Sequence, residues 1–579
     1  MTQTAFNEYK LHLASPVLTE EEKNELRGIE GCEDEIEMRF GGGLAFGTAG
    51  LRATMGMGTA RINRLTVSRT TRGLAHLVRL SGGEERGVAI ACDSRNGSLL
   101  FAETAARVLA SCGVKAYLFD DIRPTPELSF AIRHFGCMAG INITASHNPK
   151  EYNGYKAYWE DGAQISPEQA KTVSEAVATF PILDEDFVMM TLEEAKEKGL
   201  IVLLGQETDD AYLDAVLSTV IDKDAFAAAR DLRIVYTPLH GTGYRLVPEI
   251  LRRAGLENLY TVDSQMQPSG DFPTVKKPNP EYSDVFTDGI AIAERVGSDL
   301  IIATDPDADR VGVMCRAKGG GFVTLTGNQM GALLLDYVIT ARKAKNLLPD
   351  GAFAVKSIVS TDMAYRIASY NGIRLHDVLT GFKFIGEVIK NYEAEGKADR
   401  FIFGFEESYG YLFGSYARDK DAVGATLMIA EMTAYYRQKG MTLADAMQAL
   451  YEKYGTYREA MLDIYMEGID GNERRRRLMA SLREKPLTEL GGVKVACIGD
   501  YLAGTVTELA SNRVTSTGMP ESDVLYYTLE NGDKIIFRPS GTEPKVKIYF
   551  LANGKSAKET DEKVELYKKE ASAIAAAIA

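Results

Sequence analysis

Short apolar runs recur along the chain and alternate with segments that have the spacing of an amphipathic helix. In the first round the runs are 87–93, 114–120 and 138–145, and a helical pattern at 101–113 separates the first two. Runs of this length between helices are typical of strands that are buried on both faces of a parallel or mixed sheet. The pattern therefore predicts an α/β domain in this part of the chain.

The same order of elements returns twice. An apolar run with a glycine-rich end at 232–243 precedes a helical segment, and Gly255 is the expected stop of that helix. Because the order repeats, we expect three similar α/β domains with mixed sheets. In the second round an apolar run lies at 259–263, and 299–310 is a strand pattern followed by an acidic loop; the third round includes 351–360, 373–386 and 400–410.

The N-terminal segment follows a different pattern. Residues 1–40 are rich in glutamate and predict helices. Thr19 followed by Glu22 has the spacing of a capping box, which marks a helix start. Residues 41–52 contain so many glycines that we expect a loop there.

The C-terminal segment is rich in β-branched and aromatic residues. It contains the hairpin signal Glu530-Asn531-Gly532-Asp533 and closes with an amphipathic helical pattern at 556–579. These features predict a smaller α+β domain at the end of the chain.

Composition and charge narrow the class of partner. The chain of 579 residues is 45% hydrophobic and 25% charged, with a net charge of −15. This charge argues against a general nucleic-acid binder, which needs a basic surface to displace counterions. A site for a small anionic substrate is still possible, because phosphate needs only a local cluster of cations and N–H groups.

The cysteines and the apolar segments bear on the cellular compartment. The six cysteines are scattered and form no CxxC pair, so we expect reduced thiols and neither disulfides nor a zinc site. The N-terminus has no basic stretch followed by an apolar run, and no apolar run approaches the ~18 residues of a membrane helix. We expect a cytoplasmic protein with no membrane contact.

Ser146 lies in Thr144-Ala145-Ser146-His147-Asn148-Pro149, at the end of an apolar run. Strand ends in open α/β sheets face the ligand crevice, and Asn148 and Pro149 favour a turn. The serine can be a structural turn residue or a nucleophile. No GxSxG motif surrounds it, which disfavours a serine-hydrolase elbow.

Asp305, Asp307 and Asp309 alternate directly after another apolar run. In an extended loop alternate side chains point the same way, so three carboxylates can converge on a hard cation such as Mg²⁺. An EF-hand is excluded because Arg316 stands where that motif needs its final glutamate. An acidic surface loop is the structural alternative, and the preceding buried run and Arg310 disfavour it.

Two further loops carry polar side chains after predicted strands. The loop Gly404-Phe405-Glu406-Glu407-Ser408-Tyr409-Gly410 can bind sugar hydroxyls, although a turn or a helix cap explains it equally well. The loop Arg538-Pro539-Ser540-Gly541-Thr542-Glu543-Pro544-Lys545 offers two cations, two hydroxyls and a glycine. That combination favours a phosphate cradle over an ordinary hairpin loop.

Together the four loops resemble those of the α-D-phosphohexomutase family, which includes phosphoglucomutases and phosphomannomutases. TASHNP resembles the family's phosphoserine loop, DPDADR its metal loop, GFEES its sugar loop and RPSGTEPK its phosphate loop, in the family's order. The segment FGTAGLR looks most like the branch of bacterial α-phosphoglucomutases and phosphopentomutase-like enzymes. The sugar loop lacks the Glu-x-Ser-Gly-His pattern of the shorter bacterial phosphomannomutases.

The resemblance implies four domains around a central cleft, three similar α/β domains with mixed sheets and a smaller C-terminal α+β domain. We expect these boundaries: 1–210 with the phosphoserine loop, 211–325 with the metal loop, 326–455 with the sugar loop and 456–579 with the phosphate loop.

The resemblance also implies roles for individual residues. At the transferred phosphoryl group it places Ser146 as carrier, Lys156 and Arg52 beside it, His147 as a phosphate contact or general-acid helper, and Lys420 as candidate general base. The implied Mg²⁺ ligands are Ser146, through a phosphoryl oxygen, and Asp305, Asp307 and Asp309. The implied substrate-binding residues are Arg310, Lys383, Glu406, Ser408, Arg418, Arg538, Ser540, Gly541, Thr542 and Lys545.

The implied activity is an isomerase that interconverts glucose 1-phosphate and glucose 6-phosphate, a small phosphosugar, with glucose 1,6-bisphosphate as intermediate and activator. Phosphomannomutase or phosphopentomutase activity with the same mechanism is the alternative. A non-catalytic phosphosugar-binding protein is disfavoured because Ser146, the three aspartates and Arg538 are all present. A haloacid-type phosphatase is disfavoured because its nucleophilic aspartate loop would lie near a domain start, whereas the aspartate loop 305–310 lies in the middle of the chain.

Overall fold

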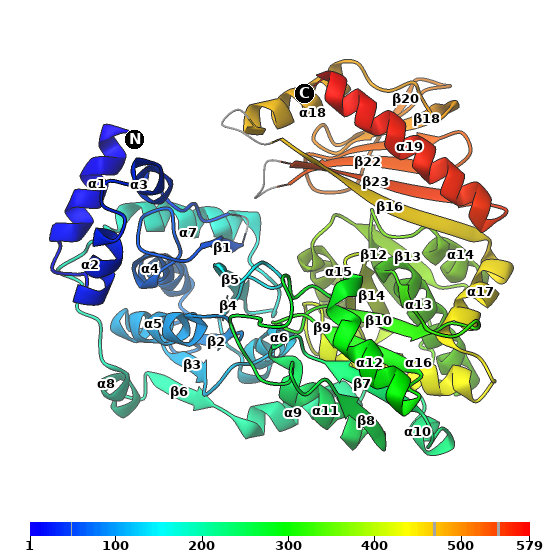
Figure 1. Ribbon diagram of the computed structural model, residues 1–579, viewed down its shortest axis with the longest axis horizontal. Helices are drawn as coiled ribbons and strands as arrows, with labels where there is room; N and C mark the ends of the chain where they lie inside the picture. Colours follow the sequence, from blue (N-terminus) through cyan, green and yellow to red (C-terminus); the bar gives the residue numbers. More distant parts are fainter. Residues whose placement is uncertain (48, 467–470, 541–544, 579) are drawn as a thin grey trace. The chain divides into compact units, whose positions relative to one another are not determined.

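The computed structural model describes residues 1–47, 49–466, 471–540 and 545–578 (Figure 1). The chain forms two compact units, each built from several segments. The first unit contains residues 1–325, 386–399 and 410–442, and the second contains 326–385, 400–409 and 443–579. The serine and aspartate loops therefore belong to the first unit, and the predicted sugar and phosphate loops belong to the second.

A six-stranded mixed sheet forms the first α/β domain, in the order β1-β5-β4-β2-β3-β6. Neighbours among β2, β3, β4 and β6 are parallel, whereas β5 is antiparallel to both β4 and β1. β2 and β4 are buried along their whole length, as their unbroken apolar runs predict. The strands are β1 (Gly50–Thr54), β2 (Val88–Cys92), β3 (Ala116–Phe119), β4 (Ala139–Ile143), β5 (Tyr152–Trp159) and β6 (Ile201–Leu204). The helices are α4 (Arg64–Leu80), α5 (Ser98–Ser111), α6 (Thr125–Phe135), α7 (Pro167–Thr179) and α8 (Leu192–Glu197).

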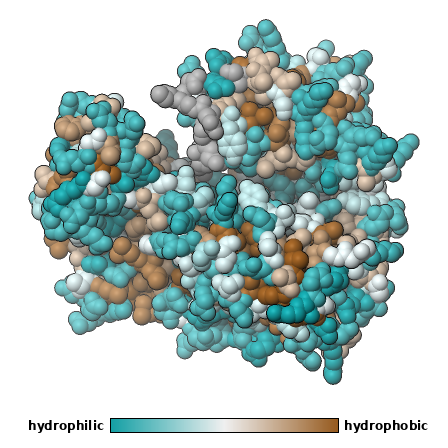
Figure 2. Space-filling model, in the orientation of Figure 1, coloured by the Kyte–Doolittle hydropathy of each residue, from teal (hydrophilic) through white to brown (hydrophobic). Residues whose placement is uncertain are grey.

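Three short helices precede this sheet: α1 (Gln3–Ala14), α2 (Glu20–Arg27) and α3 (Glu33–Phe40). They bury Tyr9, Leu26 and Phe40 in a small core of their own. The predicted capping box is confirmed, because Thr19 and Glu22 bond each other's backbone N–H groups at the start of α2. Figure 2 shows their surface as mainly hydrophilic, which matches the glutamate-rich sequence.

The prediction of a loop over 41–52 is wrong at its end, because β1 begins at Gly50. Gly50 has φ +151°, and a Cβ atom there would meet the carbonyl oxygen of Tyr155 at 1.8 Å. The glycine is therefore what lets the edge strand approach β5. The resulting register places Arg52 opposite Gly154 and Gly50 opposite Lys156.

The second α/β domain has a five-stranded sheet in the order β11-β10-β9-β7-β8. β7 is parallel to β8 and β9, and β10 is antiparallel to β9 and β11. The strands are β7 (Arg233–Thr237), β8 (Asn258–Thr261), β9 (Leu300–Thr304), β10 (Val311–Arg316) and β11 (Phe322–Leu325). The accompanying helices are α9 (Gln206–Leu217), α10 (Ala225–Ala228), α11 (Gly243–Arg253), η1 (Ser283–Phe286) and α12 (Thr287–Val296).

Later segments complete the first unit. The buried helix α16 (Ala422–Arg437) packs against α10 and α11, and its Glu431 accepts hydrogen bonds from the N–H groups of Ile221 and Asp222. The second domain is thus closed by a helix from much later in the sequence. The neighbouring elements are α15 (Phe382–Ala394), η2 (Ala398–Arg400) and β15 (Gly410–Leu412).

The second unit contains the third α/β domain and the C-terminal domain. Its parallel strands follow the order β13-β12-β14, with β12 (Phe353–Ser357), β13 (Arg374–Val378) and β14 (Phe401–Glu406). The helices are α13 (Gly327–Ala344), α14 (Met363–Asn371) and α17 (Leu443–Tyr454).

The C-terminal domain is an antiparallel sheet in the order β16-β23-β22-β21-β18-β19-β20, with β17 beside β18. The long final helix α19 contacts β16 and β23. The strands are β16 (Thr456–Tyr465), β17 (Glu489–Leu490), β18 (Val493–Asp500), β19 (Thr505–Glu508), β20 (Arg513–Ser516), β21 (Leu525–Leu529), β22 (Lys534–Pro539) and β23 (Lys545–Gly554), and the helices are α18 (Gly471–Glu484) and α19 (Ala557–Ile578).

The predicted fold class is confirmed: three α/β domains precede a β-rich C-terminal domain. The numerical domain boundaries and the central cleft stay predictions.

Candidate active site

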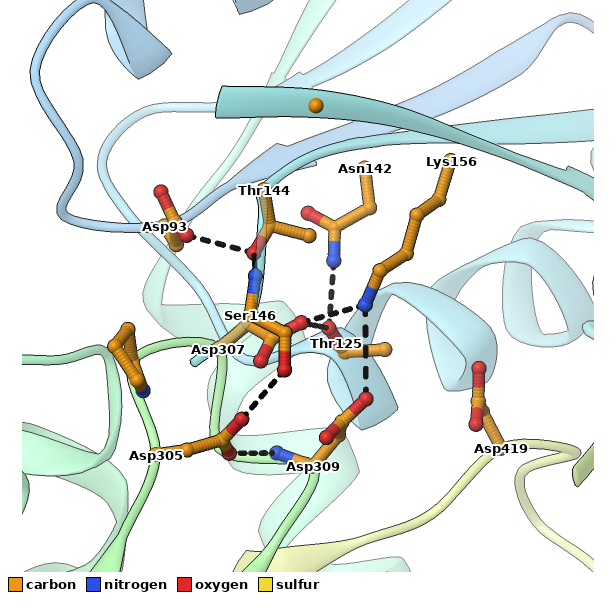
Figure 3. Close-up of polar contacts among 12 residues, drawn as sticks. Asp93, Thr125, Asn142, Thr144, Ser146, Lys156, Asp305, Asp307, Asp309 and Asp419 are labelled. Atoms are coloured by element: carbon orange, nitrogen blue, oxygen red, sulfur yellow. Dashed lines mark hydrogen bonds and ion pairs between the residues drawn. The ribbon is translucent and has the colours of Figure 1, made fainter. Parts of the chain in front are cut away.

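Ser146 lies in the turn that follows β4, at the carboxyl end of the first sheet. Its backbone is left-handed, with φ +52°, a conformation that is unfavourable for residues other than glycine. The Ser146 N–H donates to Thr144 Oγ1 at 2.8 Å, and Thr144 donates to Asp93 Oδ2 at 2.6 Å (Figure 3). These bonds hold the turn in a conformation that exposes the Ser146 hydroxyl to the aspartate loop.

Arg95 fixes the same turn from its other side. This buried guanidinium donates to the carbonyl oxygens of Ser146 at 2.5 Å, Pro149 at 2.8 Å and Tyr152 at 3.0 Å, and also to that of Asn148. Asp93 lies 3.3 Å from Arg95 Nε and compensates the buried charge. Four carbonyl contacts from one planar group leave the serine turn little freedom.

Asp305, Asp307 and Asp309 occupy the hairpin loop between the antiparallel strands β9 and β10. Their carboxylates converge as predicted, with ligand atoms within 4.8 Å of one another. The reason that the sequence suggested is wrong, because the loop is a turn and not an extended segment: Ala308 has φ +49°, and its N–H donates to the Asp305 carbonyl. The Asp309 and Arg310 N–H groups donate to Asp305 Oδ1 at 3.1 and 2.9 Å and orient that carboxylate.

The serine and the aspartates meet directly. Ser146 Oγ donates to Asp305 Oδ2 at 2.8 Å (Figure 3). Lys156 Nζ donates to Asp307 Oδ2 at 2.8 Å and lies 3.6 Å from Asp309 Oδ2. Lys420 Nζ lies 3.1 Å from Asp309 Oδ2. The first unit therefore brings together six of the predicted site residues around one group of buried carboxylates.

Burial and neighbouring charges shape the protonation of this group. Burial and the adjacent Asp307 and Asp309 carboxylates raise the pKa of Asp305 well above its usual range. Burial alone would also raise the pKa of Asp307, but the Lys156 ammonium outweighs it and lowers that pKa. Burial alone would lower the pKa of Lys156, and Asp307 and Asp309 reverse the effect. Lys156 thus favours the charged form of Asp307, whereas burial and its neighbours disfavour the charged form of Asp305.

The aspartate group fits a divalent metal ion. Asp307 Oδ1 and Asp309 Oδ1 are buried and have no hydrogen-bond partner among the residues that the structure describes. Buried carboxylate oxygens without partners are unfavourable, and a hard cation is the ligand that a group of three carboxylates prefers. The chemistry of the donor set therefore matches a metal ion bound by the three aspartates.

His147 and Arg52 flank the serine. His147 Nδ1 lies 3.1 Å from Ser146 Oγ, and Arg52 Nη1 donates to Asn148 Oδ1 at 3.0 Å. Burial and the cations Arg310 and Arg52 lower the pKa of His147 well below its ordinary value. Since Ser146 donates to Asp305, a neutral His147 with its proton on Nδ1 can donate to the serine oxygen.

Arg310 and Arg418 take up different positions. Arg310 follows the aspartate loop and donates to Glu281 Oε1 at 2.6 Å. Arg418 is fully buried, donates to Glu393 Oε2 at 2.8 Å, and also donates to the carbonyls of Ser415 and Ala417. The structure therefore places Arg418 in a packing role, and its contact with substrate stays a prediction.

The predicted sugar loop begins within β14, which ends at Glu406, and its residues as far as Tyr409 belong to the second unit. Glu406 is buried, and its Oε1 accepts the N–H of Gly381 at 2.7 Å. Ser408 lies in the next turn and is partly buried. Lys383 stands at the start of α15, with its ammonium 5.3 Å from the centre of the Phe384 ring. Glu406 and the start of α15 are thus joined within this unit.

The predicted phosphate loop links β22 and β23. Arg538 Nη1 donates to Tyr549 OH at 3.0 Å, and Lys545 Nζ donates to Asp463 Oδ2 at 3.2 Å. The Ser540 N–H donates to the Lys545 carbonyl, which brings the two ends of the loop together. Gly541 and Thr542 lie outside the described residues.

Comparison with known proteins adds to this geometry. Three family models match in succession: phosphoglucomutase/phosphomannomutase α/β/α domain I at residues 43–180, domain II at 210–320 and domain III at 326–454. A phosphoglucomutase of Staphylococcus epidermidis is 37% identical over 507 residues, covering 87% of this chain and 90% of the relative. A phosphoglucomutase of Staphylococcus aureus is 35% identical over 522 residues, covering 89% of this chain and 91% of the relative.

The chain belongs to the phosphoglucomutase/phosphomannomutase family. It is therefore an enzyme of the isomerase class that transfers phosphate within a sugar.

Solved structures of the family share the fold. A phosphomannomutase-like protein of Thermus thermophilus has a TM-score of 0.67 at 22% identity and covers 92% of this chain and 99% of that one. The Paramecium phosphoglucomutase called parafusin has a TM-score of 0.66 at 19% identity, with 92% and 95% covered. Among the described helices of this family member, none is long and apolar enough to cross a membrane.

Sequence reasoning missed several residues that organise the phosphoglucomutase/phosphomannomutase site. Asp93 ends the predicted strand 87–93 and Arg95 follows it, so their place at a strand's carboxyl end was a usable signal. Thr125 donates to Asp307 Oδ2 at 2.9 Å and accepts from Asn142 at 2.6 Å. Asp419 accepts from Tyr158 at 2.9 Å and from Lys420 Nζ at 2.8 Å, and no local pattern marks it.

Proposed function

We propose that this enzyme interconverts glucose 1-phosphate and glucose 6-phosphate through a phosphorylated Ser146 and a glucose 1,6-bisphosphate intermediate. The observation that carries the proposal is the hydrogen bond of 2.8 Å between Ser146 Oγ and Asp305, inside a group of three buried carboxylates. Glucose is favoured as the sugar because the Staphylococcus relatives described above, which match most of the chain, are named phosphoglucomutases.

In the proposed reaction the Ser146 Oγ–P bond breaks while a bond forms between that phosphorus and a hydroxyl oxygen of the sugar phosphate. The hydroxyl proton leaves to a base, for which Lys420 is the candidate, and the released Ser146 oxygen takes up a proton, for which His147 is the candidate donor. In the second half the other oxygen–phosphorus bond of the bisphosphate breaks, that phosphoryl group returns to Ser146 Oγ, and both protons move back. Positioning and neutralisation of charge account for most of the catalysis of such a transfer.

The residues around Ser146 have distinct tasks. Lys156 and Arg52 would neutralise the transferred phosphoryl group, and His147 would donate a hydrogen bond to it. Asp305, Asp307 and Asp309 would hold Mg²⁺, which supplies positive charge opposite the phosphoryl oxygens when bound. Arg310 would steady the phosphoserine.

The other residues that we propose for substrate binding belong to the second unit. Glu406, Ser408 and Lys383 would contact the sugar, and Arg538, Ser540 and Lys545 would hold the phosphate that is not transferred. Gly541 and Thr542 would add hydrogen bonds there. We also place the enzyme in the cytoplasm and expect glucose 1,6-bisphosphate to activate it by phosphorylating Ser146.

A substrate panel tests the function. Purified enzyme with Mg²⁺ and catalytic glucose 1,6-bisphosphate is given the 1-phosphates of glucose, mannose, ribose and glucosamine. We expect the highest kcat/KM with glucose 1-phosphate. A higher value with mannose or ribose would replace glucose by that sugar.

Mass spectrometry tests the mechanism. The enzyme treated with glucose 1,6-bisphosphate should carry one phosphate, about 80 Da, on the peptide that contains Ser146. Ser146→Ala should abolish both the phosphate and the turnover, whereas Ser218→Ala, a change at an exposed helix cap, should keep both. Normal turnover of Ser146→Ala would disprove the phosphoserine mechanism.

A further inference from the structure

A cavity lies in the first unit, outside the candidate active site. It has a volume of about 70 Å³ and is lined by α4, by α5 and by the segment 181–189. We call it the arginine pocket, after Arg64, Arg69 and Arg72 of α4, which line it with Ser68, Phe187 and Met189. None of these residues takes part in the proposed reaction.

The wall of the pocket is firmly built. The Arg72 guanidinium lies 4.2 Å from the centre of the Phe180 ring and 4.4 Å from that of Phe187, and its Nη1 donates to Asp184 at 2.8 Å. Farther along the segment, Ser111 Oγ accepts the Met190 N–H at 2.8 Å. These contacts hold the segment against α4 and α5, so the pocket does not depend on a loose loop.

The charges in the pocket do not balance. Arg64 is paired with Glu22 at 2.6 Å, and Arg72 is paired with Asp184. Arg69 is partly buried and has no carboxylate within 4 Å among the described residues, and its one hydrogen bond is from Nε to the Val177 carbonyl at 3.0 Å. Burial lowers the pKa of Arg69. One positive charge in excess therefore lies in a partly dehydrated pocket.

Size and donors indicate the class of anion. A cavity of about 70 Å³ holds roughly five to seven water molecules at about 10–15 Å³ each, which is enough room for the five heavy atoms of a phosphate group. The Ser68 hydroxyl lines the pocket, and it has no hydrogen-bond partner within the described part of the chain. A guanidinium with free N–H groups beside a hydroxyl is a favourable phosphate environment.

We propose that the arginine pocket is a second anion site that binds a phosphate group through Arg69, Ser68 and Arg72. The alternative is that Arg69 serves only the C-terminal end of α7, whose carbonyl at Val177 it contacts. Both explanations predict some loss of stability when Arg69 is changed. Only the proposal predicts saturable phosphate binding at this pocket.

Methyl NMR separates the two explanations. In protein labelled at the methionine methyl carbons, the Met189 resonance is assigned by its loss in Met189→Leu and then followed during a titration with inorganic phosphate. Parallel titrations use methyl phosphate, a simple phosphomonoester, and sodium chloride at equal ionic strength. The signal reports this pocket and not the active site, because Met189 lines the pocket.

The Met189 resonance should shift saturably with inorganic phosphate and stay unchanged with chloride. Arg69→Gln should weaken the apparent affinity by about tenfold or more, because a charge-assisted bond to phosphate is lost. Arg79→Gln, the same change at an exposed position of α4, should leave the affinity unchanged. Ser68→Ala should weaken binding if Arg69→Gln does not fold.

A shift with methyl phosphate as well would identify phosphomonoesters as ligands, and a shift with inorganic phosphate alone would limit the site to free phosphate. An equal shift with chloride, or an unchanged affinity in Arg69→Gln and Ser68→Ala, would overturn the proposal.

Discussion

Ser146 combines an unfavourable backbone conformation with a favourable set of contacts. Its left-handed φ of +52° costs on the order of 1–2 kcal/mol for a residue with a Cβ atom. Thr144, Asp93 and Arg95 compensate this cost through the bonds to the turn. Strain that is held by specific bonds keeps the hydroxyl in one place, and the proposed in-line transfer requires that placement.

The first prediction concerns Arg95. Arg95→Lys keeps the charge but cannot bond four carbonyls at once, so the serine turn should shift. We expect kcat to fall by about a hundredfold, the effect of a displacement near 1 Å, with little change in KM. Arg86→Lys, which also loses carbonyl bonds but lies elsewhere, is the control. A lower melting temperature with an unchanged kcat would limit Arg95 to stability.

The second prediction concerns Asp307. Asp307→Asn removes one negative charge from the aspartate group and leaves Lys156 without its main partner. We expect the Mg²⁺ concentration for half-maximal activity to rise by about tenfold or more, together with a lower kcat. Asp561→Asn at an exposed ion pair is the control. Wild-type metal dependence in Asp307→Asn would exclude this loop as the metal site.

The sequence predicts a site residue only where residues of one chemical type recur at a regular local spacing. The alternation of Asp305, Asp307 and Asp309 indicated converging carboxylates, although the turn at Ala308 brings them together in a different way. Asp419 reaches the site from more than a hundred residues away, so its role depends on tertiary contacts that no local pattern encodes.

At the scale of elements, the hairpin β22–β23 presents the proposed phosphate loop. Arg538 stands near the end of β22, beside Tyr549 of β23. Arg538→Ala should raise KM for glucose 1-phosphate and glucose 6-phosphate alike, by about ten- to a hundredfold. Arg513→Ala, on the exposed strand β20, should leave both unchanged. A large effect in one direction only would contradict a shared phosphate clamp.

We expect Glu459, on strand β16, to make the stability of the folded protein depend on pH. Burial raises the pKa of Glu459 to about 7, and one carboxylate oxygen has no hydrogen-bond partner among the described residues. A raised pKa means that the folded state holds the proton more tightly than the unfolded state. The stabilising contribution is complete below about pH 4.5 and is lost as the pH rises through about 7.

Glu459→Gln removes this titration. Its thermal midpoint should therefore decrease less than that of the wild type between about pH 5 and pH 8. Glu452→Gln on the exposed face of α17 should keep the wild-type slope. Parallel slopes for wild type and Glu459→Gln would show that Glu459 titrates normally.

Element types were predictable where the apolar runs were unbroken. The strands β2, β4 and β9 coincide with such runs because they are buried on both faces. The edge strand β1 was missed because its pairing depends on the close approach at Gly50, which a glycine-rich sequence does not reveal.

At the scale of the molecule, the C-terminal domain packs on the third α/β domain within the second unit. Ile358, Val359 and Leu379 are buried against Tyr549 and other residues of the C-terminal sheet, and Lys534 Nζ lies 2.6 Å from Asp362. The two domains therefore share a hydrophobic core. The sequence did not indicate this core, because its pattern at these residues is that of ordinary strand ends.

The last prediction concerns this shared core. A chain that stops after Gly455 should expose Ile358, Val359 and Leu379 and bind a hydrophobic dye at low temperature, because apolar patches of this kind attract such probes. Adding Ile358→Ser and Val359→Ser to the truncated chain should reduce dye binding. No dye binding by the truncated chain would show that the third domain is self-sufficient.

Residues 410–442 belong to the first unit, although most of the chain between 326 and 409 belongs to the second. This order has a consequence for synthesis on the ribosome. Lys420 contacts Asp309 but is translated about 110 residues later, which at 5–20 residues per second is a delay of about 6 to 22 seconds. During that interval the nascent aspartate loop lacks one of its two lysine neighbours, and the second sheet lacks α16. Newly made chains thus pass through a stage in which the three aspartates are already present and Lys420 is not.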